Sequence, residues 1–191
     1  MYLVFDTETT GLPKNYNAPE TDIENWPRLV QMAWIQFDLD GNQLQSKSYI
    51  IKPKGFSIPL DAVKIHGITT EQAKQKGVSL SKVLREFSEY LDTSSVLVAH
   101  NISFDTKIIG AEFVRQKMSH KMHLKKKVCT KEISTDYCEL PGNYEGYKWP
   151  KLSELHYKLF GENFKEAHNA LIDSEACAKC FFELKKQGLV P

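Results

Sequence analysis

The 191-residue chain is predicted to fold as one layered α/β domain around a mixed β-sheet. Three observations predict this class. The N-terminal residues follow the two-residue period of a strand, a hairpin signal joins the next two strands, and the later segments alternate between helix and strand patterns. The resulting order of elements is βββαβαβα. No internal repeat and no linker divides the chain, so a single domain over residues 1–191 is expected.

The predicted first strand lies within residues 2–12 (YLVFDTETTGL) and carries two acids. Its strongly apolar start places it in the centre of the sheet, covered on both faces. Because strand side chains alternate between faces, Asp6 and Glu8 share a face and lie about 7 Å apart. Two like charges beside apolar residues require a compensating cation, and open carboxylate oxygens suit Mg²⁺ or Mn²⁺ better than zinc. A solvated strand end explains an isolated Asp-x-Glu pair equally well.

The elements that follow the first strand are read from turn signals and hydrophobic periodicity. Residues 13–28 contain three prolines and neither regular period, which predicts a long loop that forms a rim or lid beside the acids. Residues 29–38 and 43–51 form a hairpin around Asp40-Gly41. The remaining predicted elements are short helical turns within 53–77, a helix over 79–92, a strand at 96–99, a helix over 101–117, an edge strand at 128–133, a loop over 135–149, and helices over 151–160 and 169–187.

Composition narrows the class of protein. No window approaches the ~20 consecutive apolar residues of a membrane span, and no secretory or lipidation signal is present. The four cysteines follow no disulfide pattern, which indicates a reduced, cytoplasmic setting and a protein without membrane contact. A formal net charge of +1 provides no broad positive field for duplex DNA.

Two further acids interrupt apolar helix stripes. Asp105 precedes Ile108, Ile109 and Phe113 at offsets of three, four and eight residues, so its carboxylate faces the core side of its helix. Asp173 lies on the stripe of the last helix in the same way. Acids at the carboxyl ends of sheet strands meet at one edge, where Asp6 and Glu8 also lie. For Asp105 alone, an acid stabilised by the helix dipole is an alternative explanation.

His168 precedes the last helix in the stretch EAHNALIDSEA. An isolated histidine is more often a hydrogen-bonded structural residue than a catalytic one. Within reach of four acids, however, an imidazole that titrates near neutral pH is suited to take a proton from an attacking water.

Three motifs carry a family resemblance: FDTETTGL at 5–12, HNISFD at 100–105 and HNALIDSEA at 168–176. Together with IHGIT at 65–69, they resemble the exonuclease motifs of the DEDDh, or DnaQ-like, 3′–5′ exonucleases. The resemblance implies an RNase H-like three-layer fold, with a five-stranded mixed sheet of order 3-2-1-4-5 whose second strand is antiparallel.

The resemblance also implies roles for individual residues. Asp6, Glu8 and Asp173 would bind two divalent cations, Mg²⁺ or Mn²⁺, and Asp105 would act largely through water. His168 would be the general base. Substrate contacts are implied for four further residues: Thr9, Leu12, His66 and Asn101.

The activity expected from this resemblance is metal-dependent 3′–5′ hydrolysis of single-stranded or frayed nucleic acid ends to nucleoside 5′-monophosphates, with DNA favoured. The chain resembles the polymerase III epsilon branch more than the RNA-trimming branches, which makes polymerase proofreading and a polymerase partner one expected role. Three alternatives stay open: an exoribonuclease that trims RNA 3′ ends, an RNase H-like endonuclease, and a noncatalytic nucleic-acid-binding module on the same fold. DNA against RNA and the oligomeric state are not readable from the sequence.

Three weaker signals remain. Cys177-x-x-Cys180 has no matching second pair, so buried thiols explain it better than zinc does. The basic stretch 117–131 is either a solvated surface or a contact for a nucleic acid backbone. Aromatic side chains in the following loop either stack unpaired bases or anchor the loop: Tyr144, Tyr147 and Trp149.

Overall fold

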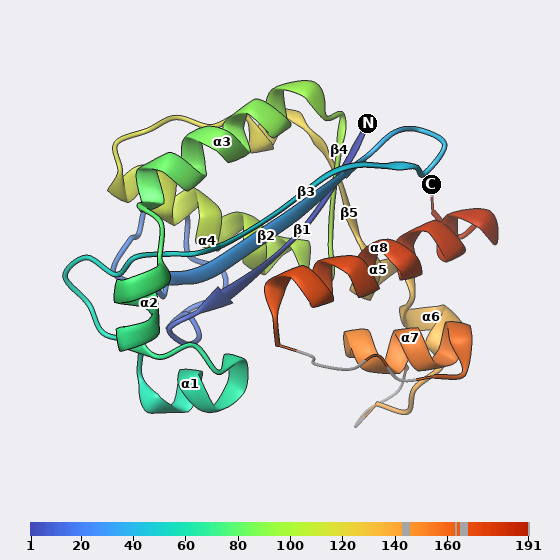
Figure 1. Ribbon diagram of the computed structural model, residues 1–191. Helices are drawn as coiled ribbons and strands as arrows, with labels where there is room; N and C mark the ends of the chain where they lie inside the picture. Colours follow the sequence, from blue (N-terminus) through green and yellow to red (C-terminus); the bar gives the residue numbers. More distant parts are fainter. Residues whose placement is uncertain (143–145, 163, 165–167, 191) are drawn as a thin grey trace.

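The computed structural model describes residues 1–142, 146–162, 164 and 168–190. Tyr144 therefore lies outside the described residues. A five-stranded sheet of order β3-β2-β1-β4-β5 forms the middle of the molecule (Figure 1). Its strands are β1 (Tyr2–Thr9), β2 (Leu29–Phe37), β3 (Gln43–Ile50), β4 (Val96–Ala99) and β5 (Lys126–Cys129). Since β2 is antiparallel to both neighbours and β1, β4 and β5 are parallel, the predicted fold class and topology are confirmed.

Helices cover both faces of this sheet. They are α1 (Leu60–His66), α2 (Thr70–Lys76), α3 (Leu80–Thr93), α4 (Ile102–Arg115), α5 (Thr130–Ile133), α6 (Thr135–Cys138), α7 (Leu152–Phe160) and α8 (Ala170–Lys186), with a 3-10 turn, η1 (Met122–Leu124). Helices α3 and α4 lie on one face, and α8 lies on the other (Figure 1). No helix in the described ranges is both long and apolar enough to cross a bilayer.

The alternation of side chains along β1 divides the core between the two faces. Leu3 and Phe5 pack with Phe87 of α3 and the apolar stripe of α4. Val4, on the opposite face, packs with Phe181 of α8. Because β1 lies between β2 and β4 and is covered on both sides, its central position is confirmed. Its two acids, Asp6 and Glu8, lie in the C-terminal half of the strand.

Two predicted elements near the C-terminal half were wrong in their bounds. The edge strand expected at 128–133 is β5 at Lys126–Cys129, and residues 130–133 form α5. Lys126 and Lys127 are exposed on this edge strand, so charged residues obscured its beginning. The loop expected over 135–149 begins with α6, which buries Cys138 against Leu155 and Cys180. A four-residue helix is too short to show a period.

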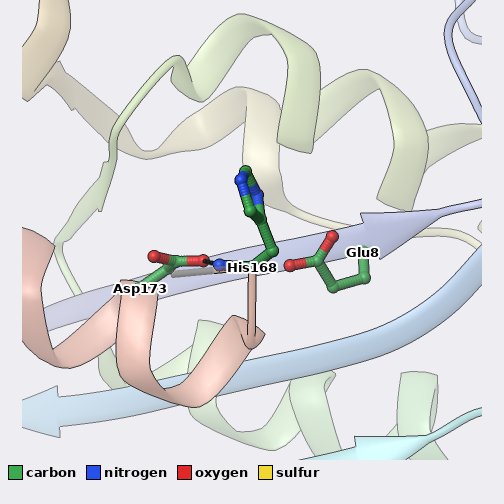
Figure 2. A group of neighbouring side chains, drawn as sticks. All are labelled: Glu8, His168 and Asp173. Atoms are coloured by element: carbon green, nitrogen blue, oxygen red, sulfur yellow. Dashed lines mark hydrogen bonds between the residues drawn. The ribbon is translucent and has the colours of Figure 1, made fainter. Parts of the chain in front are cut away.

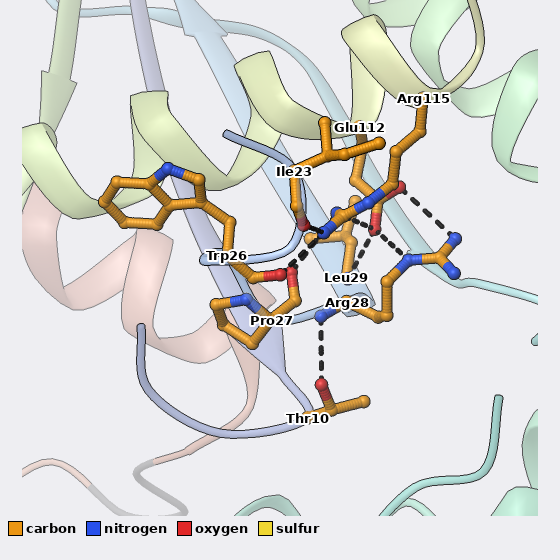
Figure 3. Close-up of polar contacts among 8 residues, drawn as sticks. All are labelled: Thr10, Ile23, Trp26, Pro27, Arg28, Leu29, Glu112 and Arg115. Atoms are coloured by element: carbon orange, nitrogen blue, oxygen red, sulfur yellow. Dashed lines mark hydrogen bonds and ion pairs between the residues drawn. The ribbon is translucent and has the colours of Figure 1, made fainter. Parts of the chain in front are cut away.

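The long loop between β1 and β2 is fixed by polar contacts with α4 (Figure 3). Glu112 is fully buried, accepts hydrogen bonds from Arg28 and from the Leu29 backbone, and pairs with Arg115 at 3.1 Å. The Arg115 guanidinium in turn donates to the backbone carbonyls of Ile23 and Trp26. The buried carboxylate thus binds both guanidinium groups, and through them the loop is attached to the helix.

Removing the Glu112 carboxylate is expected to destabilise the protein strongly. Glu112→Ala leaves the partly buried Arg115 without its counter-charge, and breaking such a buried pair typically costs about 3–5 kcal/mol. Urea unfolding monitored by circular dichroism measures the change. Asp61→Ala is the matched control, because Asp61 belongs to an exposed pair with Lys64 and its loss should leave the midpoint unchanged. Equal midpoints for the two variants would contradict the assigned role of Glu112.

Candidate active site

An open cleft of about 460 Å³ lies at the carboxyl edge of β1 and β4. Asp6 and Glu8 enter it from the end of β1, and Asp105 from the first turn of α4. Asp173 enters from the first turn of α8, and His168 from the segment just before that helix. The structure therefore brings together in one cleft the five residues that the sequence singled out as catalytic or metal-binding.

Glu8, His168 and Asp173 form the tightest part of this group. Their candidate ligand atoms all lie within 4.8 Å of one another. Figure 2 shows the carboxylates of Glu8 and Asp173 on either side of His168, with the His168 backbone N–H donating to Asp173 Oδ2 at 2.8 Å. The two acids are nearly buried, whereas the His168 side chain is exposed to solvent. An exposed imidazole beside buried carboxylates can exchange protons with water.

The start of α8 is held by residues on either side of it. Gln31 of β2 accepts a hydrogen bond from the Ala170 backbone N–H at 3.2 Å, and the Asn169 side chain caps the helix at the Leu171 N–H. His168 itself has a φ of +72°, a left-handed conformation that is uncommon outside glycine. Since the hydrogen bond to Asp173 uses the backbone of this turn, the unusual conformation fixes His168 next to the acid.

Asp105 is held from the opposite side of the cleft. It is almost fully buried, and its Oδ1 accepts a hydrogen bond from the Thr7 hydroxyl at 2.7 Å. The sequence analysis did not single out Thr7, so it missed this contact. The neighbouring Asn101 begins α4 with a φ of +91°, and its Oδ1 accepts from Lys131 Nζ at 2.6 Å. These contacts fix the first turn of α4 against the end of β1.

Burial raises the pKa values of all four clustered acids, and repulsion from neighbouring acids raises those of Asp6 and Glu8 further. Burial, followed by the charges of Asp105, Asp173 and Glu8, raises the pKa of Asp6 well above its usual range. Burial, with smaller effects from Asp173 and Asp105, raises the pKa of Glu8 to about 8. Burial also raises the pKa of Asp105 to about 7. It raises the pKa of Asp173 as well, although the hydrogen bond from the His168 N–H lowers that pKa in part. The cluster is therefore poorly stabilised as four anions.

The chemistry of this donor set fits divalent cations. In the described part of the chain, none of the four acids forms an ion pair with lysine or arginine. Several carboxylate oxygens in one open cleft match the preference of Mg²⁺ and Mn²⁺ for oxygen ligands. Glu8 and Asp173, whose oxygens face each other across His168, are the residues placed to share one cation, and Asp6 and Asp105 lie next to them.

The four residues expected to contact substrate are placed differently from one another. Asn101 lines the cleft, whereas Thr9, Leu12 and His66 are not among its lining residues. Leu12 is 74% exposed on the turn after β1. Burial lowers the pKa of His66, and this effect outweighs that of the Thr9 backbone, which raises it. Among the described residues, His66 Nε2 is a buried polar atom without a hydrogen-bond partner.

His100 also lines the cleft, and the sequence did not single it out. Its two ring nitrogens lie 3.0 Å from the Thr130 hydroxyl and 3.0 Å from the Pro150 carbonyl oxygen. Burial lowers its pKa to about 4, so the ring is neutral near pH 7. It therefore acts as a spacer between the end of β4 and the segment before α7. Only its place in the motif HNISFD could have drawn attention to it.

The structure also places the residues of two remaining sequence signals, the cysteines and the basic stretch. All four cysteines are free and buried, and burial raises the pKa of the Cys180 thiol to about 12, as expected for buried thiols. In the basic stretch 117–131, Lys121 pairs with Asp92, and Lys125 donates to the Ser94 carbonyl. Lys131 lies next to the candidate active site.

The raised pKa of Glu8 leads to a pH-dependent stability that can be measured in the metal-free protein. Between the ordinary glutamate pKa near 4.5 and the folded value of about 8, the folded state binds more protons than the unfolded state. Stability should therefore fall as pH rises from 5 to 9 in EDTA, since deprotonation favours unfolding. Glu8→Gln should be more stable than wild type at pH 9, by roughly 1–3 kcal/mol, and about equal at pH 5.

Thermal unfolding at several pH values tests this expectation. Mn²⁺ should raise the melting temperature of the wild type more at pH 8 than at pH 6, because cation binding displaces the protons. The exposed residue Glu71 provides the control Glu71→Gln, which should follow the wild type throughout. A Glu8→Gln variant that loses stability with pH as steeply as the wild type would count against the electrostatic assignment.

Comparisons with known proteins show the family of this chain. Residues 3–181 match the family model RNase_T, described as Exonuclease. The PolC-type DNA polymerase III of Streptococcus pneumoniae serotype 2 is 32% identical over 187 residues, which are 97% of this chain and 11% of that protein. The polymerase III epsilon subunit of Treponema pallidum is 28% identical over 189 residues, covering 94% of this chain and 74% of that subunit.

Solved structures show the same fold. Exonuclease I of E. coli in complex with a dA16 oligonucleotide superposes with a TM-score of 0.77 at 22% identity, over 98% of this chain and 42% of that chain. The chain thus spans only about a tenth of the PolC-type polymerases that it matches and under half of exonuclease I. The family match covers nearly the whole chain. The protein belongs to the RNase_T exonuclease family, and its resemblance to the DnaQ-like exonucleases is confirmed.

Proposed function

We propose that this protein is a metal-dependent 3′–5′ exonuclease that removes nucleoside 5′-monophosphates from the end of single-stranded or frayed DNA. The observation that carries the proposal is the convergence of four acids and His168 in one open cleft of a DnaQ-like fold. Residues 1–191 act in this proposal as a single catalytic domain. A noncatalytic module would have no physical reason to retain uncompensated, partly buried acids.

Asp6, Glu8, Asp105 and Asp173 are the proposed cation-binding residues. Two bound divalent cations supply Lewis-acid stabilisation of the charge that develops on the phosphate oxygens. The four carboxylates together provide the negative potential that attracts such ions, and their repulsion adds to the effect of burial in raising the pKa values of Asp6 and Glu8. Thr7 holds Asp105 in place, and the His168 N–H holds Asp173.

His168 is the proposed general base. An imidazole nitrogen takes a proton from the water that attacks the phosphorus atom, and the exposed ring then releases this proton to solvent. The bond from phosphorus to the 3′-oxygen of the preceding nucleotide breaks, so the released nucleotide keeps the 5′-phosphate. His168 suits this role because its backbone is fixed by Asp173 while its side chain stays accessible.

Recognition of the 3′ end is assigned to residues at the end of β1 and beside it. Thr9 and the exposed side chain of Leu12 offer a backbone and an apolar contact for a terminal nucleotide, and Asn101 offers a polar one within the cleft. The buried Nε2 of His66 lacks a partner among the described residues, which supports a hydrogen bond to substrate at this position.

A polymerase is the proposed partner. The similar PolC-type and epsilon proteins are named as DNA polymerase III or one of its subunits, which supports a proofreading role for this chain. An exonuclease that acts on frayed ends would remove a mismatched terminal nucleotide more readily than a paired one, because the mismatched end unpairs at lower cost.

Single substitutions of the proposed cation-binding acids are expected to abolish hydrolysis while the protein stays folded. Asp6→Asn, Glu8→Gln and Asp173→Asn should each lower the rate at least about 10²–10³-fold, since each removes charge stabilisation from the reaction. The assay uses 5′-labelled linear and circular DNA and linear RNA, with Mg²⁺, Mn²⁺ or EDTA. The exposed acid Asp61 provides the control Asp61→Asn.

The substrates in this assay separate the alternatives. Shortening of linear DNA from its 3′ end, with no cleavage of circles and no reaction in EDTA, is the expected result. Cleavage of circular DNA would indicate an endonuclease, and faster hydrolysis of RNA would indicate an exoribonuclease. Near-wild-type hydrolysis by a folded Asp6→Asn variant would refute the proposed cation site.

Removal of the proposed base should change both the rate and its pH dependence. His168→Ala is expected to lower kcat by about 10²–10⁴-fold and to flatten the acidic limb of the pH–rate profile. His123→Ala is a matched control, because His123 is exposed and lies on η1. An unchanged acidic limb in His168→Ala would show that another group takes the proton.

A further inference from the structure

A second groove, of about 450 Å³, adjoins the candidate active site. Its lining residues come from the loop after β1, from the start of α4, from α5 and from the segment before α7: Tyr16, Asn17, Trp26, Asn101, Ser103, Phe104, Lys131, Glu132 and Trp149. We propose that this aromatic groove binds an unpaired base of the DNA strand upstream of the terminal nucleotide. The inference rests on the proposed exonuclease function. It adds that the enzyme recognises an unpaired base that lies away from the bond that is hydrolysed.

The aromatic groove is continuous with the cleft that holds the acids. Asn101 and Phe104 line both, so a strand whose end lies in the cleft has an adjoining path through the groove. Lys131 stands at this junction. Its ammonium group donates to Asn101 Oδ1 at 2.6 Å, and its charge lowers the pKa of Asp105 against the larger effect of burial. A cation in this position can meet the phosphate that precedes the reacting one.

Two of the aromatic rings that line the groove, Tyr16 and Trp149, are open to solvent. Tyr16 is 55% exposed and lies 6.4 Å from the Phe104 ring, measured between centroids. Trp149 is 63% exposed and lies under the Lys131 ammonium at 4.1 Å. Exposed aromatic rings next to a cation suit a base and its phosphate, because bases of any sequence stack on an aromatic face.

Both walls of the groove are anchored to the fold. The loop that carries Tyr16 is attached by Asn25, whose side chain bonds the Asn15 backbone at both N–H and carbonyl. The segment that carries Trp149 is attached through the Pro150 carbonyl, which lies 3.0 Å from His100 Nε2. The rings are therefore held near their positions before substrate binds, which lowers the entropic cost of stacking.

The occupant that fits best is a single strand. Lys131 and Glu132 bring opposite charges to the groove, so it lacks the multiple cations that would hold a duplex by its phosphates. A base that stacks on Trp149 has to leave its own helical stack and its pairing partner. The groove lies apart from the reacting phosphate and would thus favour substrates whose ends are unpaired.

Substrates that lack one base test this inference directly. Oligothymidylates with a single abasic residue, moved from the second to the fourth position from the 3′ end, are compared in single-turnover removal of the first nucleotide. At one of these positions, loss of the base should lower kcat/KM of the wild type by about 5- to 100-fold, the range expected for one stacked base. In Trp149→Ala the same abasic residue should have little further effect, because base and ring contribute through one contact.

A small substrate separates this inference from the proposed function. The p-nitrophenyl ester of thymidine 5′-monophosphate has no upstream nucleotide, so Trp149→Ala should lose at least five times more activity on oligothymidylate than on the ester. Tyr157→Ala, which removes a ring of similar exposure from α7, is the matched control and should not change this ratio. If the wild type hydrolysed neither the oligothymidylate nor the ester, the proposed function would be refuted. Hydrolysis of both, with equal losses in Trp149→Ala and Tyr157→Ala, would overturn the groove assignment.

Binding without turnover provides a second readout. Trp149 is exposed whereas Trp26 and Trp34 are buried, so oligothymidylate added in EDTA should quench the fluorescence of Trp149. Trp149→Phe should remove this quenching while retaining an aromatic ring. Lys131→Gln should reduce the slope of log affinity against log salt by about one, the change expected when one phosphate contact is lost. Quenching of equal size in Trp149→Phe would show that the strand does not reach the groove.

Discussion

The repulsion among four carboxylates at the end of β1 is the constraint on which the rest of this structure depends. Each acid is at least partly buried, and burial raises its pKa, with a further increase from neighbouring acids at Asp6 and Glu8. A fold tolerates such a group only if the surrounding elements are fixed without help from the acids. The fully covered β1 and β2 and the layers on either side of them provide this rigidity.

Contacts around the cluster fix the acids one by one. Thr7 holds Asp105, the His168 backbone holds Asp173, and Gln31 of β2 holds the turn before α8. Two residues at the cleft, Asn101 and His168, adopt left-handed backbone conformations. Such conformations are costly for residues other than glycine and are often found where side chains must be placed accurately. The strained positions here adjoin the acids.

Much of the fold and the membership of the site could be predicted from the sequence. The period of β1, the stripe behind Asp105 and the stripe behind Asp173 each place an acid on a buried face, and topology then brings these faces to one edge. The contact between Thr7 and Asp105 could not be predicted, because it joins residues 98 positions apart through the packing of a helix on a strand. The left-handed turns at Asn101 and His168 were hidden for a similar reason, since neither residue is a glycine.

The aromatic groove shows where prediction from sequence ends. Tyr16 and Trp149 lie in segments without regular structure, whose courses are set by contacts with distant residues such as Asn25 and His100. A hydrophobic period reports which face of an element is buried, but it carries no information on the path of a loop. The bounds predicted for β5 were wrong for a different reason. Exposed lysines at the start of this edge strand weaken the hydrophobic pattern from which a strand is predicted.

The order of the acids along the chain has a consequence for biosynthesis. Asp6 and Glu8 emerge from the ribosome first, whereas Asp173 and His168 belong to the turn and helix that follow α7 by several residues. A nascent polypeptide that has been translated only as far as α7 lacks one wall of the cleft and its exposed imidazole. The candidate active site is therefore completed late in translation, and incomplete chains or proteolytic fragments without α8 would lack Asp173.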